Sequence, residues 1–204
     1  MGLTIMTRKL RIHLPEATYH AISRCIEKKS LMRSPKIKKL MIEVLNLALD
    51  KYNFQLIGYT IMNNHFHLYI KTVADGENIS RIMQFIKSQF ARRYNRMMNR
   101  TGPFWNERFK DTITELTPNP RETFFNTLLY LGYNPVRSGL VNDPRDYFYS
   151  SIRSYLDENY ISPVKITLHT FFLELGNTFT DCVNKLQDYE DMYRRRIFHE
   201  SLFT

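Results

Sequence analysis

The alternation of strand-like and helix-like segments limits the folds open to this chain more than any other feature of its sequence. Runs rich in β-branched and aromatic residues predict four strands, over residues 19–26, 54–62, 65–72 and 109–115. Apolar residues three and four positions apart predict two amphipathic helices, over residues 35–52 and from 79 to about 98. The order strand–helix–strand–strand–helix–strand predicts a ferredoxin-like α+β fold, an antiparallel sheet with helices on one face.

The remainder of the chain is expected to be helical. A third helix should follow the prolines at 118 and 120 and end at Pro135, because proline lacks the backbone donor and clashes with the preceding turn. Beyond about residue 155 the sequence predicts a mostly helical tail. We therefore expect one domain over residues 1–156 and a helical extension over residues 157–204.

Composition restricts the class of protein. A hydrophobic fraction of 43% supplies a core and excludes global disorder. The 29 Lys and Arg residues exceed the 20 Asp and Glu, and a net charge of +9 indicates either a polyanionic partner such as nucleic acid or a solvated basic surface. Two cysteines cannot form a disulfide framework or a four-cysteine zinc site, and no apolar run is long enough to span a bilayer. These features predict a soluble intracellular protein.

His65 and His67 are the sharpest chemical feature. Residues two apart on a strand point to the same face, so the two imidazoles converge while Phe66 points away. Two imidazoles on one face can ligate a metal ion. The alternative is a pair of partly exposed strand histidines without a ligand.

Tyr130 and Asn134 form a second pair. A spacing of four places both on one face of the third predicted helix, with Asn126 one turn earlier. Tyr130 could instead be a boundary tyrosine whose hydroxyl lies in water. Asn134 precedes Pro135 and could equally cap the end of the helix.

The second predicted helix is strongly basic. Between residues 81 and 100 there is no acidic residue, and aromatic side chains are interleaved with the basic ones. A merely solvated helix usually carries both signs of charge, so this pattern favours a phosphate-binding surface. Its basic residues are Arg81, Lys87, Arg92, Arg93, Arg96 and Arg100.

Several stretches in order resemble the single-tyrosine HUH transposases of the IS200-like type, in particular the REP-associated tyrosine transposases. The resemblance covers roughly residues 17–156, and residues after about 157 match nothing in it. It begins with Tyr19-His20 through Arg24 on the first strand. The segments that follow are NNHFHLYI (63–70), GPFWNERFKDTI (102–113), YLGYNPVRSGLV (130–141) and DYFYSSIRSYL (146–156).

The resemblance implies a transposase that cleaves and joins single-stranded DNA containing hairpins. Tyr130 would be the nucleophile and would form a 5′-phosphotyrosine intermediate. His65, His67 and Asn134 would hold Mg²⁺ or Mn²⁺, with Mn²⁺ better suited to imidazole ligands. Arg137 would join the basic helix in binding DNA. The protein would be a monomer or homodimer of the bacterial cytoplasm, nucleoid-associated when bound to DNA, with no membrane partner.

Two alternative functions and the role of one residue stay open. A domesticated, non-catalytic nucleic-acid-binding regulator would keep the basic helix and tolerate loss of Tyr130. A metal-dependent RNA phosphodiesterase would use metal-bound water and not need that tyrosine. His20, on the first strand, could be a further polar group of the site or a structural residue.

Overall fold

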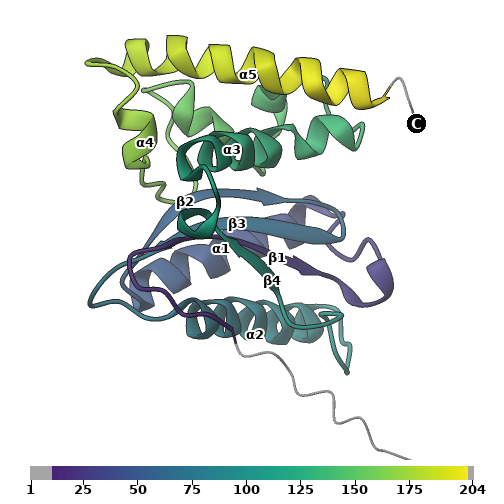
Figure 1. Cartoon of the computed structure of the whole chain (residues 1–204). Coiled ribbons are helices and arrows are strands. Elements are labelled where there is room, and N and C mark those ends of the chain that lie inside the picture. Colours follow the sequence, from purple (N-terminus) through teal and green to yellow (C-terminus); the bar gives the residue numbers. More distant parts are fainter. Residues whose placement is uncertain (1–10, 202–204) are drawn as a thin grey trace, which may run out of the picture.

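A four-stranded sheet lies in the middle of the molecule, with helices above and below it (Figure 1). The computed structural model describes the backbone of residues 11–201 and the side chains of residues 11–197. The longer elements are β1 (Thr18–Arg24), α1 (Pro35–Lys51), β2 (Phe54–Ile61), β3 (His65–Thr72), α2 (Ile79–Met97), β4 (Lys110–Ile113), α3 (Pro120–Arg137), α4 (Thr170–Leu173) and α5 (Phe179–Ser201). Within the described chain, no helix combines the length and the apolar character needed to cross a bilayer.

The sheet has the strand order β2-β3-β1-β4, and all neighbouring strands are antiparallel. The predicted ferredoxin-like α+β fold is thereby confirmed. In the pairing of β1 with β3, His20 lies opposite Tyr69 and Ile22 lies opposite His67. Because side chains alternate along a strand, His65, His67 and Tyr69 share one face of the sheet.

The lower face of the sheet in Figure 1 is covered by α1 and α2. The apolar stripe of α2 is buried as its spacing predicts, with Ile82, Met83, Ile86 and Phe90 all inaccessible to solvent. Phe66 packs in the same cluster, on the opposite side of β3 from its two histidine neighbours. The two helices predicted between the strands, α1 and α2, thus lie together on one face of the sheet, as the ferredoxin-like pattern predicts.

The upper face is covered as well, by α3 and by residues of the C-terminal extension (Figure 1). Phe124 and Phe125 of α3 share a buried cluster with Phe172 of α4 and Leu186 of α5. Residues 157–169 contain no helix, and the backbone amide of Thr167 donates a hydrogen bond to the carbonyl of Leu56 on β2, at 2.9 Å. The extension thus contributes to the same core as α3.

The expected end of the third helix at Pro135 is wrong. Helix α3 continues through Pro135 to Arg137, so Asn134 is an interior helical residue and not a cap. Proline leaves the carbonyl four residues earlier, that of Leu131, without its helical donor. The hydroxyl of Thr60 on β2 donates to that carbonyl at 2.7 Å, and this bond from the sheet allows the helix to continue.

Candidate active site

The site lies between the upper face of the sheet and α3. His67 is buried with only 1% of its surface exposed, whereas His65 is half-buried. The centroids of their two rings are 4.9 Å apart and their planes are nearly perpendicular. The alternation of β3 therefore brings the predicted histidine pair together.

A neighbouring side chain engages the Nδ1 atom of each ring. His65 Nδ1 lies 2.6 Å from Asn64 Oδ1, and because a carbonyl oxygen only accepts, the histidine nitrogen carries the proton. His67 Nδ1 lies 3.0 Å from His20 Nε2. With His67 Nδ1 as the donor, the Nε2 atoms of both His65 and His67 keep free lone pairs.

Helix α3 places Tyr130 and Asn134 over these rings. The Tyr130 and His67 ring centroids are 5.3 Å apart, and those of Tyr130 and His20 are 5.9 Å apart. Asn134 Nδ2 lies 3.4 Å from His67 Nε2, which is consistent with a lone pair on that nitrogen. The side chains of Tyr130 and Asn134 on α3 and of His65 and His67 on β3 thus meet at one place.

The histidines of this cluster are neutral at neutral pH. Burial lowers the pKa of His20 to about 4. The pKa of His65 is also lowered to about 4, first by burial and then by the charge of Arg24. Deeper burial, with His20 and His65 close by, holds the pKa of His67 well below its usual range. Neutral imidazoles are the form that binds metal ions.

The donor atoms fit a divalent metal ion. Histidine ligands commonly donate the second ring N–H to a fixed partner, and Asn64 and His20 are placed to accept from His65 and His67. Among the side chains of residues 11–197, no group of three or more His, Cys, Asp or Glu could hold a metal ion. A third protein ligand would therefore be the side-chain amide of Asn134. An amide ligates through its oxygen, and a flip of the Asn134 amide group would place that oxygen where Nδ2 now faces His67.

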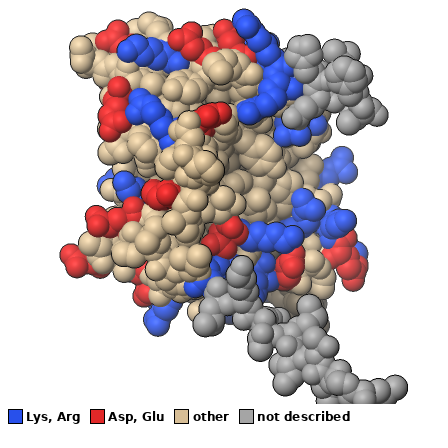
Figure 2. Space-filling view, in the orientation of Figure 1, with Lys and Arg blue, Asp and Glu red and all other residues tan. Residues whose placement is uncertain are grey.

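The predicted DNA-binding residues lie on α2, just after it and at the end of α3. On α2, Arg81, Arg92, Arg93 and Arg96 are exposed and Lys87 is half-buried, and Arg100, after the end of the helix at Met97, is also half-buried. Arg137, at the end of α3, holds its guanidinium 5.8 Å from the centre of the Tyr130 ring. Figure 2 shows acidic and basic side chains interspersed on the face with the orientation of Figure 1, with groups of basic ones near the C-terminal end of α5 and at the lower right of the view. Only Arg137 of the predicted residues is thus beside the tyrosine.

Sequence reasoning missed two neighbours of the histidines. Asn64 lies in the segment NNHFHLYI (63–70) and no role in the site was expected for it, yet its side chain engages the Nδ1 atom of His65. Arg24 lies opposite His65 in the β1–β3 pairing and contributes positive charge at the site. The proximity of Arg24 and His20 to these histidines follows from the register between β1 and β3, which the sequence alone does not specify.

Comparison with known proteins gives a consistent assignment. The family model for IS200-like transposases matches residues 13–119, just over half of the chain. This range includes His65 and His67 but ends before Tyr130 and Asn134. A curated protein of Haemophilus influenzae described as a REP-associated tyrosine transposase is 27% identical in an alignment over 111 residues, and the match covers 50% of this chain. The matched region is 61% of the length of that relative.

A solved structure gives the same fold. It is that of a REP-associated tyrosine transposase bound to a REP hairpin, with a TM-score of 0.61 and 15% sequence identity. The match covers 80% of this chain and 94% of that chain. Because 80% of the chain is more than residues 1–119 contain, the likeness extends past residue 119.

Proposed function

This chain belongs to the IS200-like transposase family, and from that premise we propose that it cleaves and rejoins single-stranded DNA through a covalent bond to Tyr130. The observation that carries the proposal is the convergence of Tyr130, His67 and Asn134 from two different elements. A weak nucleophile such as a phenol needs electrostatic help at the phosphate, and this cluster is built to supply it. The reaction class is phosphoryl transfer.

A divalent ion, Mg²⁺ or Mn²⁺, is proposed to be held by His65, His67 and Asn134. When bound, it would polarise the scissile phosphate and stabilise the departing oxygen. The imidazole donors favour Mn²⁺ over Mg²⁺. His20 and Asn64 act as positioning residues, because each engages the Nδ1 atom of a ligand ring.

The tyrosine itself carries the covalent step. The Tyr130 oxygen attacks phosphorus, loses its proton to solvent and becomes bonded to the 5′ phosphate. The bond between phosphorus and the 3′ oxygen breaks, and that oxygen takes up a proton to leave a 3′-OH. Because the energy of the phosphodiester is kept in the tyrosine ester, a second 3′-OH can reverse the reaction and join strands without ATP.

The proposed substrate is DNA with single-stranded segments and a hairpin. The solved relative with this fold is bound to a REP hairpin, and the exposed arginines of α2 offer contacts to phosphates. Arg137 lies beside the ring of Tyr130 and is proposed to contact the DNA close to the point of cleavage.

The test is formation of a covalent protein–DNA adduct. Labelled hairpin-bearing DNA with single-stranded flanks is incubated with the protein and Mn²⁺, and adducts are scored after denaturing electrophoresis. We expect Tyr130→Phe to abolish the adduct and to leave DNA affinity within about twofold, because binding depends mainly on Lys and Arg.

Tyr52→Phe is the matched control, because Tyr52 is a half-buried tyrosine that packs on Phe85, away from the site. It should form the adduct as the parent protein does. Cleavage by Tyr130→Phe at the parent rate would assign the reaction to a water nucleophile. Tight DNA binding by the parent without cleavage or adduct would indicate a non-catalytic regulator.

A further inference from the structure

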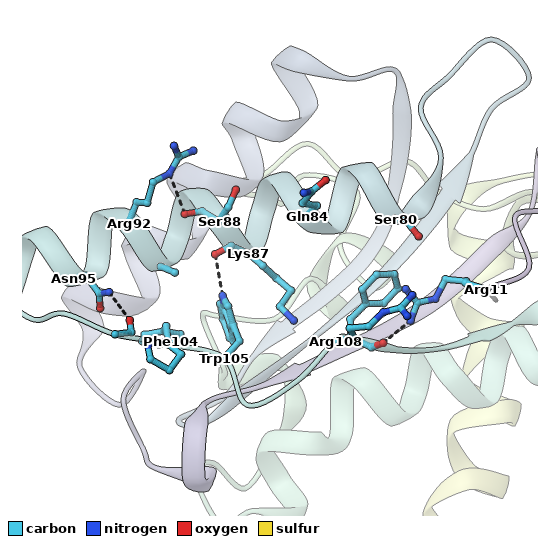
Figure 3. A pocket seen from close by; sticks show the side chains of 14 residues that line it. Arg11, Ser80, Gln84, Lys87, Ser88, Arg92, Asn95, Phe104, Trp105 and Arg108 are labelled. Carbon is cyan, nitrogen blue, oxygen red and sulfur yellow. Dashed lines mark hydrogen bonds between the residues drawn. The ribbon is translucent and has the colours of Figure 1, made fainter. Parts of the chain in front are cut away.

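An open cleft lies on the other side of the sheet from Tyr130. It is formed between α2 and the segment that leads from Gly102 to Phe109, and its volume is about 750 Å³ (Figure 3). Cavities of roughly 300–1,000 Å³ are typical of small-molecule sites in proteins. The catalytic arrangement proposed above does not use this cleft.

The cleft is positively charged. Lys87, Arg92 and Arg108 line it together with Arg11, and among the side chains of residues 11–197 no acidic one lines it. Arg11 is neutralised by Asp111 at 2.7 Å. The other three form no ion pair with any side chain of residues 11–197. Lys87 donates to the carbonyl of Glu107 at 2.6 Å, so an anion entering the cleft would meet two exposed guanidiniums, those of Arg92 and Arg108, beside this lysine.

The ring of Trp105 forms part of the same wall and is held rigidly. Its indole N–H donates to the carbonyl of Lys87 at 2.8 Å, which ties the loop to α2 (Figure 3). The ring packs against Phe66, Phe90 and Phe104, with centroids between 4.6 and 5.4 Å away. A half-buried, fixed aromatic ring beside cations is the usual platform for an unpaired base.

Hydrogen-bonding groups complete the lining. Gln84 and Ser88, both exposed, line the cleft from α2 in the row that also carries Arg92 (Figure 3). Such amide and hydroxyl groups can bond to the edge of a base. The basic residues of α2 continue from the cleft to Arg96. A single strand of DNA whose phosphates contact these residues would therefore pass the mouth of the cleft.

We propose that this cleft binds one unpaired nucleotide of the DNA substrate, its base stacked on Trp105 and its phosphate against Arg108, with Arg92 available to a neighbouring phosphate of the same strand. The base must be unpaired because a paired base is already stacked on both sides within its duplex. The inference rests on the proposed function for its ligand, since the nucleotide belongs to the same single-stranded DNA. It adds a second anchoring point, separated from the cleavage site by the sheet.

Trp105 is the only tryptophan of the chain, so its fluorescence reports on the cleft alone. The full-length protein is titrated with octathymidylate, with an octamer that has the same phosphates but abasic sugars, and with thymidine 5′-monophosphate. We expect quenching by octathymidylate and none by the other two at equal nucleotide concentration. Binding of octathymidylate without quenching would overturn the proposal, and equal quenching by the monophosphate would reassign the cleft to free nucleotides.

Substitutions test the stacking directly, with affinity followed by anisotropy of labelled octathymidylate. Trp105→Ala should weaken binding about 5- to 100-fold, the usual effect of losing one stacked base. Phe148→Ala, which truncates an aromatic side chain that is 51% exposed elsewhere, should leave the affinity unchanged. Because Trp105→Ala also removes core packing, Arg108→Gln provides a second variant at an exposed position, with exposed Arg33→Gln as its control. Parent affinity in both cleft variants would overturn the proposal.

The adduct assay, run in parallel on the parent protein, separates the two proposals. Adduct formation without quenching would reject the cleft and keep the proposed reaction. Quenching without an adduct would keep the cleft and reject the reaction.

Discussion

At the scale of single residues, the proposed metal ligands depend on partners that take no part in the chemistry. Asn64 and His20 engage the Nδ1 atoms of His65 and His67 and leave the Nε2 atoms free. Burial then keeps these rings neutral. The orientation and the neutral state of the His65 and His67 rings are thus both set in the absence of an ion. We therefore expect metal binding to depend on pH differently from binding by exposed histidines.

Binding of Mn²⁺ should persist to lower pH than for an exposed histidine pair. The pKa of His65 is lowered to about 4, so its lone pair stays available until the pH falls toward that value. We expect the affinity measured by calorimetry to be constant from neutral pH to about pH 5 and to fall below it. His67→Ala serves as the control and should lose most of the binding at every pH. A decline centred near pH 6.5, the ordinary pKa of histidine, would contradict this reading.

The sequence predicts the placement of a site residue where that placement follows from local periodicity, and not where it depends on contacts between distant segments. Strand alternation places His65 and His67 on one face, and helix spacing does the same for Tyr130 and Asn134, because both are local rules. The contact between His20 and His67 depends on the register of two strands whose residues are 47 positions apart in the chain. No local pattern specifies that register.

At the scale of elements, α3 shows how a tertiary contact overrides a local rule. Pro135 should end the helix, yet the Thr60 hydroxyl satisfies the carbonyl that proline leaves unpaired. The helix can therefore continue past Asn134, which remains one turn from Tyr130. The sequence predicted the helix but could not predict its end, because the missing donor comes from β2.

A double-mutant cycle tests this explanation. Thr60→Val leaves the buried Leu131 carbonyl without its donor and should lower the free energy of unfolding by about 1–3 kcal/mol. Pro135→Ala restores the helical N–H four residues after Leu131. In that background the cost of Thr60→Val should be smaller by about 1 kcal/mol, as measured by urea unfolding of the four proteins. Additive effects would show that the Thr60 hydroxyl does not compensate for the proline.

The basic surface of α2 makes a prediction about salt. Arg92, Arg93 and Arg96 are exposed and lie off the buried stripe of the helix, so the triple change to Gln should preserve the fold. Each lost phosphate contact should reduce the slope of log K against log salt by about 0.7 for single-stranded DNA, and three contacts by about 2.

The matched control for this salt titration removes three exposed lysines that lie outside α2. It combines Lys36→Gln, Lys39→Gln and Lys165→Gln, and so changes the net charge by the same amount. The control should keep the slope of the parent protein. An equal loss of slope in both triple variants would attribute the effect to net charge, and an unchanged slope in the α2 variant would remove this helix from the DNA site.

At the scale of the whole molecule, the sheet has a hydrophobic cluster on each face, and one of them includes the C-terminal extension. Phe172 of α4 is fully buried, with its ring centroid 5.0 Å from that of Tyr155 and 5.7 Å from that of Phe179. The sequence predicted a helical extension, but its packing against α3 is a long-range contact that no local pattern specifies. The division at residue 156 therefore remains a prediction, and it has a measurable consequence.

If residues 157–204 were a separate domain, they would unfold independently of the sheet. We expect instead one cooperative transition, because α4 and α5 share a core with α3 and with Ile57 of β2. Phe172→Ala should lower the free energy of unfolding by about 3–5 kcal/mol. The shift should be the same by far-UV circular dichroism and by the fluorescence of Trp105, which packs in the cluster on the opposite face. Phe148→Ala, at an exposed position, should shift neither signal. Two transitions, with Trp105 unaffected by Phe172→Ala, would establish the extension as an independent unit.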